Sequence, residues 1–201
     1  MRFDTLLFDL DGTLVDPRRR LYSLFVELTH SDLSYTEYWK LKEAGLRQSD
    51  MLYHIGYDGD FSAFSKDWLK QVEREDLLRL DVLFTEVLDV IKRFHDQGRK
   101  LYVVTNRQSL SGTEKELDCL GIGCFIDDVI TTYQRISKSE AVKQSEIKYG
   151  HGIFIGDSKE DMEAAANLGI QCVLVDREHR NDKSIPSDYQ VNDLTPLLEC
   201  L

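Results

Sequence analysis

Proline is scarce in this chain of 201 residues, which has three prolines and none between Pro17 and Pro186. Because proline interrupts helices and sheet interiors, its absence leaves room for long helices after Pro17. The sequence also lacks any apolar run near the ~20 residues that span a membrane, and any charged-then-apolar leader, internal repeat or low-complexity segment. With 42% hydrophobic residues, we expect a globular, cytoplasmic protein without a membrane partner.

Positive charge is also in short supply. The chain has 25 Lys and Arg against 36 Asp and Glu, a formal net charge of -11. This balance disfavours DNA and RNA as partners, and no basic stripe provides an exception. A small anionic substrate stays compatible, because a local cation and a metal ion can hold it. The short basic run at 18–20 is expected to form a solvated helix face.

Cysteine is limited to four residues, and none of them has the close paired spacing of a zinc site. They are Cys119, Cys124, Cys172 and Cys200. Cys172 lies in an apolar run, where a small buried thiol is normal. We therefore expect four reduced cysteines.

The most informative stretch is a strand-length apolar run that ends at Phe8 and leads into Asp9 and Asp11. If the extended conformation continues through Asp11, both carboxylates face the same space, because strand side chains alternate. Two carboxylates at so short a distance repel each other unless one is protonated or a cation lies between them. Mg²⁺ suits this position because it prefers oxygen ligands. A calcium loop is excluded, because Leu14 and Arg20 stand where such a loop needs glycine and glutamate. A solvated turn is the alternative.

Strands and helices alternate through the C-terminal part of the chain. The expected strands are 100–105, 125–130, 152–155 and 171–175, and the expected helices are 85–98, 112–120, 139–149 and 159–168, before a polar loop and a short terminal helix. Thr85 can cap the first of these helices and Gly98 can end it. Strands separated by helices require a parallel sheet with crossovers. We therefore predict an α/β fold, a doubly wound Rossmann-like sheet with ligands at the carboxyl ends of its strands.

The segment 17–81 has a different character. Two stripes of apolar residues recur at helical spacing, namely Leu21, Leu24, Phe25 and Leu28, and Phe61, Phe64, Trp68 and Val72. Polar and glycine-bearing breaks divide the segment into three or four helices. We predict a small helical domain at 17–81, inserted into a core domain formed by 1–16 and 82–201.

Polar residues gather where the predicted strands end. The set comprises Asp9, Asp11, Thr105, Asn106, Lys138, Asp157 and Asp161. Carboxylates with a divalent ion, a lysine and a hydroxyl form a phosphate site, because the metal and the ammonium neutralise phosphoryl oxygens while the hydroxyl orients them. The pattern indicates a phosphate site.

These residues carry a resemblance to a known family. The segments that match are Phe8-Asp9-Leu10-Asp11-Gly12-Thr13, Val103-Val104-Thr105-Asn106, Lys138 and Gly156-Asp157-Ser158-Lys159-Glu160-Asp161. In this order they resemble the four motifs of the haloacid dehalogenase superfamily, in the branch of phosphoglycolate phosphatase and β-phosphoglucomutase. The helical insertion resembles the cap domain of that branch, and the resemblance covers essentially the whole chain.

The resemblance implies a role for each residue. Asp9 would be an ionised nucleophile that forms an aspartyl-phosphate, and Asp11 would protonate the leaving group and then accept a proton from water. Mg²⁺ would bind the Asp9 carboxylate, the Asp11 backbone carbonyl and Asp157. Thr105, Asn106 and Lys138 would bind the phosphoryl group, and Asp161 would support the metal or Lys138. In the cap, Arg47 would contact the substrate.

Each assignment has an alternative. Ser158 and Asp161 can also form a capping box that opens a helix, and the two roles are compatible. Thr105 and Asn106 can be a simple turn. Lys138 lacks the following proline common in the family, and Lys143 lies nearby, but only Lys138 precedes the predicted helix. Arg47 can be an ordinary solvated side chain.

The sequence as a whole predicts a Mg²⁺-dependent phosphatase that acts on a small phosphorylated metabolite. A phosphotransferase of the sugar-phosphate mutase type would use the same core residues, since it returns the phosphoryl group to a sugar. A non-catalytic module that binds a phosphate ligand is the third reading, although a pure binder has no need for Asp11 to exchange protons. Monomer and homodimer are both compatible with the sequence.

Overall fold

The computed structural model describes residues 3–177 and 185–201. The chain divides into two compact units, one formed by Met1–Asp16 with Val82–Leu201 and the other by Pro17–Asp81. The first is called the core unit below and the second the helical unit. Each is described by itself.

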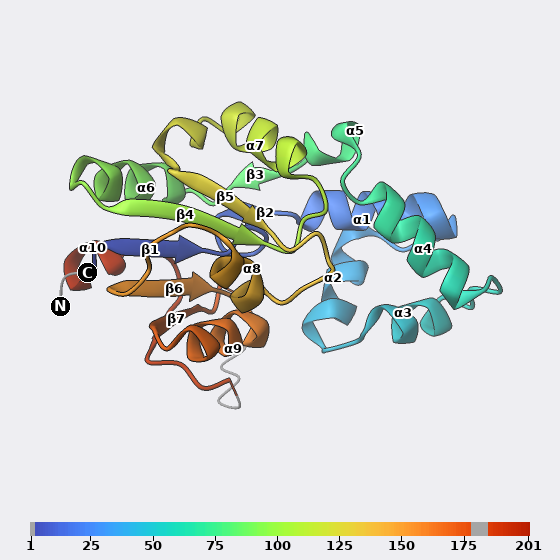
Figure 1. Cartoon of the computed structure of the whole chain (residues 1–201). Coiled ribbons are helices and arrows are strands. Elements are labelled where there is room, and N and C mark those ends of the chain that lie inside the picture. Colours follow the sequence, from blue (N-terminus) through green and yellow to red (C-terminus); the bar gives the residue numbers. More distant parts are fainter. Residues whose placement is uncertain (1–2, 178–184) are drawn as a thin grey trace. The chain divides into compact units, whose positions relative to one another are not determined.

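The core unit is built on a six-stranded sheet (Figure 1). In spatial order its strands are β5 (Asp128–Thr131), β4 (Lys100–Thr105), β1 (Thr5–Phe8), β6 (Gly152–Gly156), β7 (Gln171–Val175) and β8 (Tyr189–Val191). All neighbouring strands are parallel, and β1 lies between β4 and β6. The carboxyl ends of β1, β4 and β6 therefore meet at one edge of the sheet.

Helices cover both faces of this sheet. They are α6 (Val87–Asp96), α7 (Leu110–Cys119), α8 (Lys138–Gln144), α9 (Lys159–Leu168) and α10 (Leu197–Cys200), with a short 3-10 helix at Gly123–Phe125. Leu6 and Phe8 pack with α6, α7 and α10 in one apolar cluster, whereas Leu7 packs with α8 and α9 in another. Alternate side chains of β1 thus point into two separate cores. The predicted doubly wound α/β fold is confirmed.

Several predicted boundaries need correction. The strand predicted at 125–130 is β5, which begins only at Asp128, because Gly123–Phe125 forms a 3-10 helix. Helix α6 is preceded by Glu86, so Thr85 is not its cap. The helix predicted at 139–149 is α8, which begins at Lys138 and ends at Gln144. Strand β8 was missed, and the loop predicted before it lies partly outside the described residues.

Strand β1 ends at Phe8, so the extended conformation does not run through Asp11 as the alternation argument required. The chain turns instead, with Gly12 at a φ of 91°. It then forms β2 (Val15–Asp16), which pairs antiparallel with β3 (Val82–Leu83). This small pair was not predicted from the sequence. It brings together the two points at which the chain leaves and rejoins the core unit.

The helical unit contains five helices, whereas three or four were predicted. They are α1 (Arg18–Thr29), α2 (Tyr35–Glu43), α3 (Gln48–His54), α4 (Phe61–Gln71) and the short α5 (Glu75–Leu78). Phe25, Tyr38 and Phe64 are fully buried at its centre, and the ring centroids of Phe25 and Tyr38 lie 5.0 Å apart. Phe61 was predicted to belong to this core, but it is 49% exposed at the start of α4.

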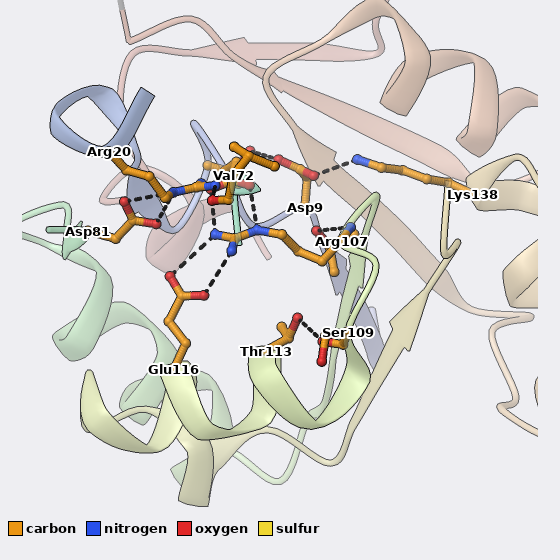
Figure 2. A network of polar contacts seen from close by, with 12 residues as sticks. Asp9, Arg20, Val72, Asp81, Arg107, Ser109, Thr113, Glu116 and Lys138 are labelled. Atoms are coloured by element: carbon orange, nitrogen blue, oxygen red, sulfur yellow. Dashed lines mark hydrogen bonds and ion pairs between the residues drawn. The ribbon is translucent and has the colours of Figure 1, made fainter. Parts of the chain in front are cut away.

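A buried ion pair also lies within the helical unit. Nε of Arg20 lies 2.8 Å from Oδ2 of Asp81, and Nη1 of Arg20 donates a hydrogen bond to the Val72 carbonyl (Figure 2). Both charged side chains are almost inaccessible to solvent. The expected solvated face at 18–20 is therefore wrong for Arg20, because a carboxylate 61 positions away in the chain accompanies it into the interior.

Two expectations from composition can be compared with the structure. All four cysteines are free, and Cys172 is buried, as predicted. Among the helices of residues 3–177 and 185–201, none has both the length and the apolar character that a membrane crossing requires.

Candidate active site

Asp9 is the buried centre of the polar cluster at the carboxyl end of β1. Its backbone N–H donates to the Ile155 carbonyl at 2.8 Å, which continues the sheet hydrogen bonding by one residue. Its Oδ1 accepts a hydrogen bond from Nζ of Lys138 at 2.5 Å, and its Oδ2 accepts one from the Thr13 hydroxyl at 3.2 Å. Both carboxylate oxygens are therefore oriented, and Figure 2 shows the Lys138 side chain pointing at Asp9.

Lys138 connects Asp9 with Asp161. As the first residue of α8, it directs its ammonium group to Oδ1 of Asp161 at 2.6 Å as well as to Asp9. Burial alone would lower the pKa of Lys138, but the two carboxylates outweigh it and raise the pKa above its usual value. Lys138 is thus a fixed positive charge within the cluster.

Three carboxylates of this cluster could hold a metal ion. One oxygen from each of Asp9, Asp157 and Asp161 lies within 4.8 Å of the others. The Asp157 carboxylate can approach the turn after β1 only because residue 12 is glycine. A Cβ atom at this position would lie 2.4 Å from Oδ2 of Asp157. The set suits a hard divalent cation, because three carboxylates and one ammonium leave an excess of negative charge in a largely buried space.

The electrostatics of Asp9 reflect that excess. Burial raises the pKa of Asp9; Lys138 opposes the rise, and Asp161 and Asp157 add to it, so that the pKa stands well above its usual range. The ionised Asp9 carboxylate that the sequence predicts stays a prediction, and a divalent cation among these carboxylates would favour that form.

Asp161 combines two roles in one carboxylate. Its Oδ2 accepts hydrogen bonds from the backbone N–H of Ser158 at 3.0 Å and from the Ser158 hydroxyl at 2.6 Å, which is the predicted capping box of α9. Its Oδ1 accepts the hydrogen bond from Lys138. The structural and the functional readings of this residue are therefore compatible, because different oxygens serve them.

Asp11 has a different environment from Asp9. Its Oδ2 lies 2.7 Å from Nε of Arg107, and its Oδ1 lies 2.9 Å from Nη2 of the same guanidinium. The Arg107 side chain is 4% exposed, whereas that of Asp11 is 33% exposed. The Asp11 carboxylate is therefore held from its buried side by an arginine and remains accessible from the other.

Thr105 and Asn106 lie at the end of β4, as predicted. Thr105 is buried, and its hydroxyl accepts a hydrogen bond from the Arg107 backbone N–H at 3.4 Å. The Asn106 side chain links the start of α9 with the segment that follows β5, because its Nδ2 donates to Glu160 at 3.0 Å and its Oδ1 accepts from the Thr132 hydroxyl at 2.9 Å. The side chain thus braces the edge of the sheet.

The sequence matches the family description Haloacid dehalogenase-like hydrolase over residues 6–175. The chain belongs to this family. Similar proteins include a phosphoglycolate phosphatase of Aquifex aeolicus, 27% identical with 84% of this chain and 83% of the relative covered. Another is the pyrophosphatase PpaX of Halalkalibacterium halodurans, 22% identical with 99% and 97% covered.

Solved structures of haloacid dehalogenase-like proteins share the fold. The hydrolase SP0104 from Streptococcus pneumoniae superposes with a TM-score of 0.75 at 20% identity, covering 98% of each chain. The hydrolase YfnB from Bacillus subtilis, solved bound to magnesium, has a TM-score of 0.70 at 20% identity and covers 100% of this chain and 99% of its own. The α/β fold is therefore that of the family.

Arg47 does not belong to the core unit. It stands at the N-terminus of α3 in the helical unit, where its side chain is 82% exposed and its Nε lies 3.1 Å from Oδ2 of Asp50. A contact between Arg47 and substrate stays a prediction.

Sequence reasoning missed two charged residues of this site, Arg107 and Glu116. Figure 2 shows Glu116 on α7 with its carboxylate turned toward the Arg107 guanidinium. Arg107 directly follows Thr105 and Asn106, so its position at a strand end was the available signal. Glu116 gave none, because one acidic residue in a helix is usually solvated.

Proposed function

We propose that this protein is a Mg²⁺-dependent phosphatase that hydrolyses a small phosphorylated metabolite through an aspartyl-phosphate on Asp9. The observation that carries the proposal is the environment of Asp9, a buried carboxylate oriented by Lys138 and Thr13 beside Asp157 and Asp161. Membership of a hydrolase family supports it, as do relatives named phosphoglycolate phosphatase and pyrophosphatase.

Mg²⁺ would be held by the carboxylates of Asp9 and Asp157 and by the backbone carbonyl of Asp11. When bound, it supplies positive charge that offsets the phosphoryl oxygens as the carboxylate approaches them. Asp161 serves as support, since both of its oxygens already accept hydrogen bonds from Ser158 or Lys138. The acidic trio is compatible with this arrangement.

In the first half of the reaction, a carboxylate oxygen of Asp9 attacks phosphorus and forms a new P–O bond. The ester P–O bond breaks, and the leaving oxygen keeps the bonding electron pair and takes a proton from the Asp11 carboxyl group. The Lys138 ammonium, the Thr105 hydroxyl and the Asn106 backbone N–H bind the phosphoryl oxygens.

In the second half, water attacks the phosphorus of the aspartyl-phosphate. Asp11 accepts the proton that water loses, the bond between phosphorus and Asp9 breaks, and phosphate and the free Asp9 carboxylate result. A mutase would replace water with a sugar hydroxyl, and the same residues would serve. Nothing about the core residues favours that alternative over hydrolysis.

The helical unit is proposed as the cap of this enzyme. Its insertion between the residues that follow β1 and those that precede α6 supports the proposal, as does the β2–β3 pair at its two ends. A cap excludes water during the first displacement and contributes specificity. On this reading Arg47 is a candidate for contact with the substrate, and a cytoplasmic location stays a prediction.

A groove beside Asn106 supports a site for the leaving group in the core unit. A groove of about 500 Å³ is lined by Asn106, Gln134, Arg135 and Glu160, among others. Its mixture of amide, cationic and anionic groups suits a small polar substrate better than an apolar one.

The test is phosphate release from a panel of small phosphate esters, with Mg²⁺ and with a chelator. The panel should contain phosphoglycolate, pyrophosphate, sugar phosphates, nucleotides and amino-acid phosphates. We expect metal-dependent release from one or a few members, which would also define the substrate class. Isomerisation of a sugar phosphate without phosphate release would instead establish the mutase. Tight binding of a phosphate ligand with no turnover on any member would favour the non-catalytic module.

A further inference from the structure

Arg107 is a buried cation placed against the proposed acid–base residue. Its guanidinium forms two parallel contacts with Asp11, from Nε to Oδ2 at 2.7 Å and from Nη2 to Oδ1 at 2.9 Å. A bidentate pair of this kind fixes the plane of the carboxylate as well as its position. The Arg107 side chain is 4% exposed, so water does not compete strongly for these contacts.

Glu116 holds the same guanidinium from its other side. Nη1 of Arg107 lies 3.1 Å from Oε2 of Glu116, and Nη2 lies 3.3 Å from Oε1 (Figure 2). The Glu116 side chain is 4% exposed and comes from α7, a packed helix of the core unit. Arg107 is therefore itself immobilised, and the order of contacts runs from Glu116 through Arg107 to Asp11.

Asp11 needs such support more than Asp9 does. Strand β1 ends at Phe8, and Asp11 lies in the turn before Gly12, where the sheet no longer fixes the direction of its side chain. A carboxylate that must meet both a leaving oxygen and a water molecule requires a defined orientation, because proton transfer needs hydrogen-bond distance.

We propose that Arg107 is a positioning residue for Asp11, and that Glu116 keeps Arg107 in place. This inference rests on the proposed function, since it assumes that Asp11 exchanges protons with the reacting groups. The guanidinium occupies one edge of the carboxylate. The Asp11 side chain is nevertheless 33% exposed, so the guanidinium does not seal it from the leaving group and water.

The arrangement also couples two parts of the site. Arg107 follows Thr105 and Asn106 in the same turn, and its backbone N–H donates to the Thr105 hydroxyl. The turn that presents the phosphate-binding groups therefore also carries the arginine that orients Asp11. The phosphoryl group and the proton donor are thereby placed with respect to one another by three consecutive residues.

The experiment compares two substrates that differ in their need for a proton. An alkyl phosphate releases an alkoxide that must be protonated, whereas p-nitrophenyl phosphate releases a stable phenolate. For each, kcat/KM reports the steps up to departure of the leaving group, so the ratio of the alkyl to the aryl value isolates the contribution of the acid. We expect Arg107→Gln to lower this ratio by at least ~10-fold, as part of a general-acid contribution of ~10²–10⁴-fold.

Companion variants separate positioning from a structural role. Glu116→Gln should lower the ratio in the same direction but less, and Arg107→Lys should fall between the wild type and Arg107→Gln, because a lysine cannot form the two parallel contacts. Arg93→Gln, at an exposed position on α6, should leave the ratio unchanged. If Arg107→Gln fails to fold because Glu116 loses its contact with the guanidinium, the double variant Arg107→Gln/Glu116→Gln removes both charges of that contact and should show the same lowered ratio.

The outcomes distinguish this inference from the function beneath it. Equal loss of kcat/KM on both esters in the Arg107 variants, with Asp11→Asn still lowering the ratio, would overturn the positioning role and leave the phosphatase intact. An unchanged ratio in Asp11→Asn would remove the acid role of Asp11, and the inference with it. A wild-type protein that releases phosphate from no ester would instead overturn the proposed function.

Discussion

Buried charges occur in both units of this protein, and they are balanced differently. In the helical unit, Arg20 is paired with Asp81, and the two charges offset each other. In the core unit, Lys138 faces Asp9 and Asp161 with Asp157 nearby, which leaves negative charge in excess. A balanced buried pair serves the fold, whereas an unbalanced cluster costs stability and is retained where chemistry or a metal uses it.

The largest expected effect concerns the unbalanced cluster. Asp9→Asn removes the nucleophile, so turnover should fall by at least ~10³-fold in a phosphate-release assay. The folded state should be as stable as the wild type or more so, because the buried negative charge that Asp161 and Asp157 disfavour is gone. Near-normal turnover would show that Asp9 is not the nucleophile. Loss of the cooperative thermal unfolding transition would show that this cluster is needed for the fold.

The balanced pair should respond in the opposite way. Asp81→Ala leaves Arg20 buried without this carboxylate, and we expect the free energy of unfolding to fall by ~3–5 kcal/mol in urea titrations. The matched control is Glu75→Gln, which breaks the exposed contact between Glu75 and Arg79 and should change stability little. A similar decrease in the free energy of unfolding in both variants would mean that burial does not determine how much the Arg20–Asp81 pair contributes to stability.

The smallest expected effect is a pH-dependent stabilisation of the protein by Mg²⁺. The pKa of Asp9 is raised above the unfolded value of 3.8, so its contribution to stability is fully present below that pH and is lost as pH rises through the folded pKa. Mg²⁺ requires the ionised form, and it should therefore increase the melting temperature more at pH 8 than at pH 5.

Asp9→Asn is the control for this measurement, and in that variant the difference between the two pH values should shrink. Lys138 does not affect the comparison, because its raised pKa keeps its contribution to stability fully present at both pH values, and that contribution is lost only at much higher pH. An Mg²⁺ effect of equal size at both pH values in the wild type would argue against a metal site at Asp9.

Local patterns in the sequence predicted much of the core unit. The strand at 100–105, the strand at 171–175 and the helix at 159–168 have the predicted bounds, since each depends on an apolar period with a clear stop. The residues at the ends of β1, β4 and β6 were also named, because parallel strands bring their carboxyl ends together.

The pairing of buried charges could not be predicted from the sequence. Arg107 and Asp11 lie 96 positions apart, and Arg20 and Asp81 lie 61 apart. An arginine in a basic run or after a motif looks solvated until the fold supplies a carboxylate beside it, and no short-range pattern records that partner. The β2–β3 pair was missed for the same reason, because each strand has only two residues and depends entirely on the other.

The β2–β3 pair has a consequence for the evolution of this chain. Asp16 and Val82 are directly paired, so the chain leaves and re-enters the core unit at a single point. The entropy lost on joining the two ends of a loop grows only slowly with loop length. Segments of very different size could therefore replace Pro17–Asp81 at little cost to the sheet, while Asp9, Lys138 and Asp157 keep their places.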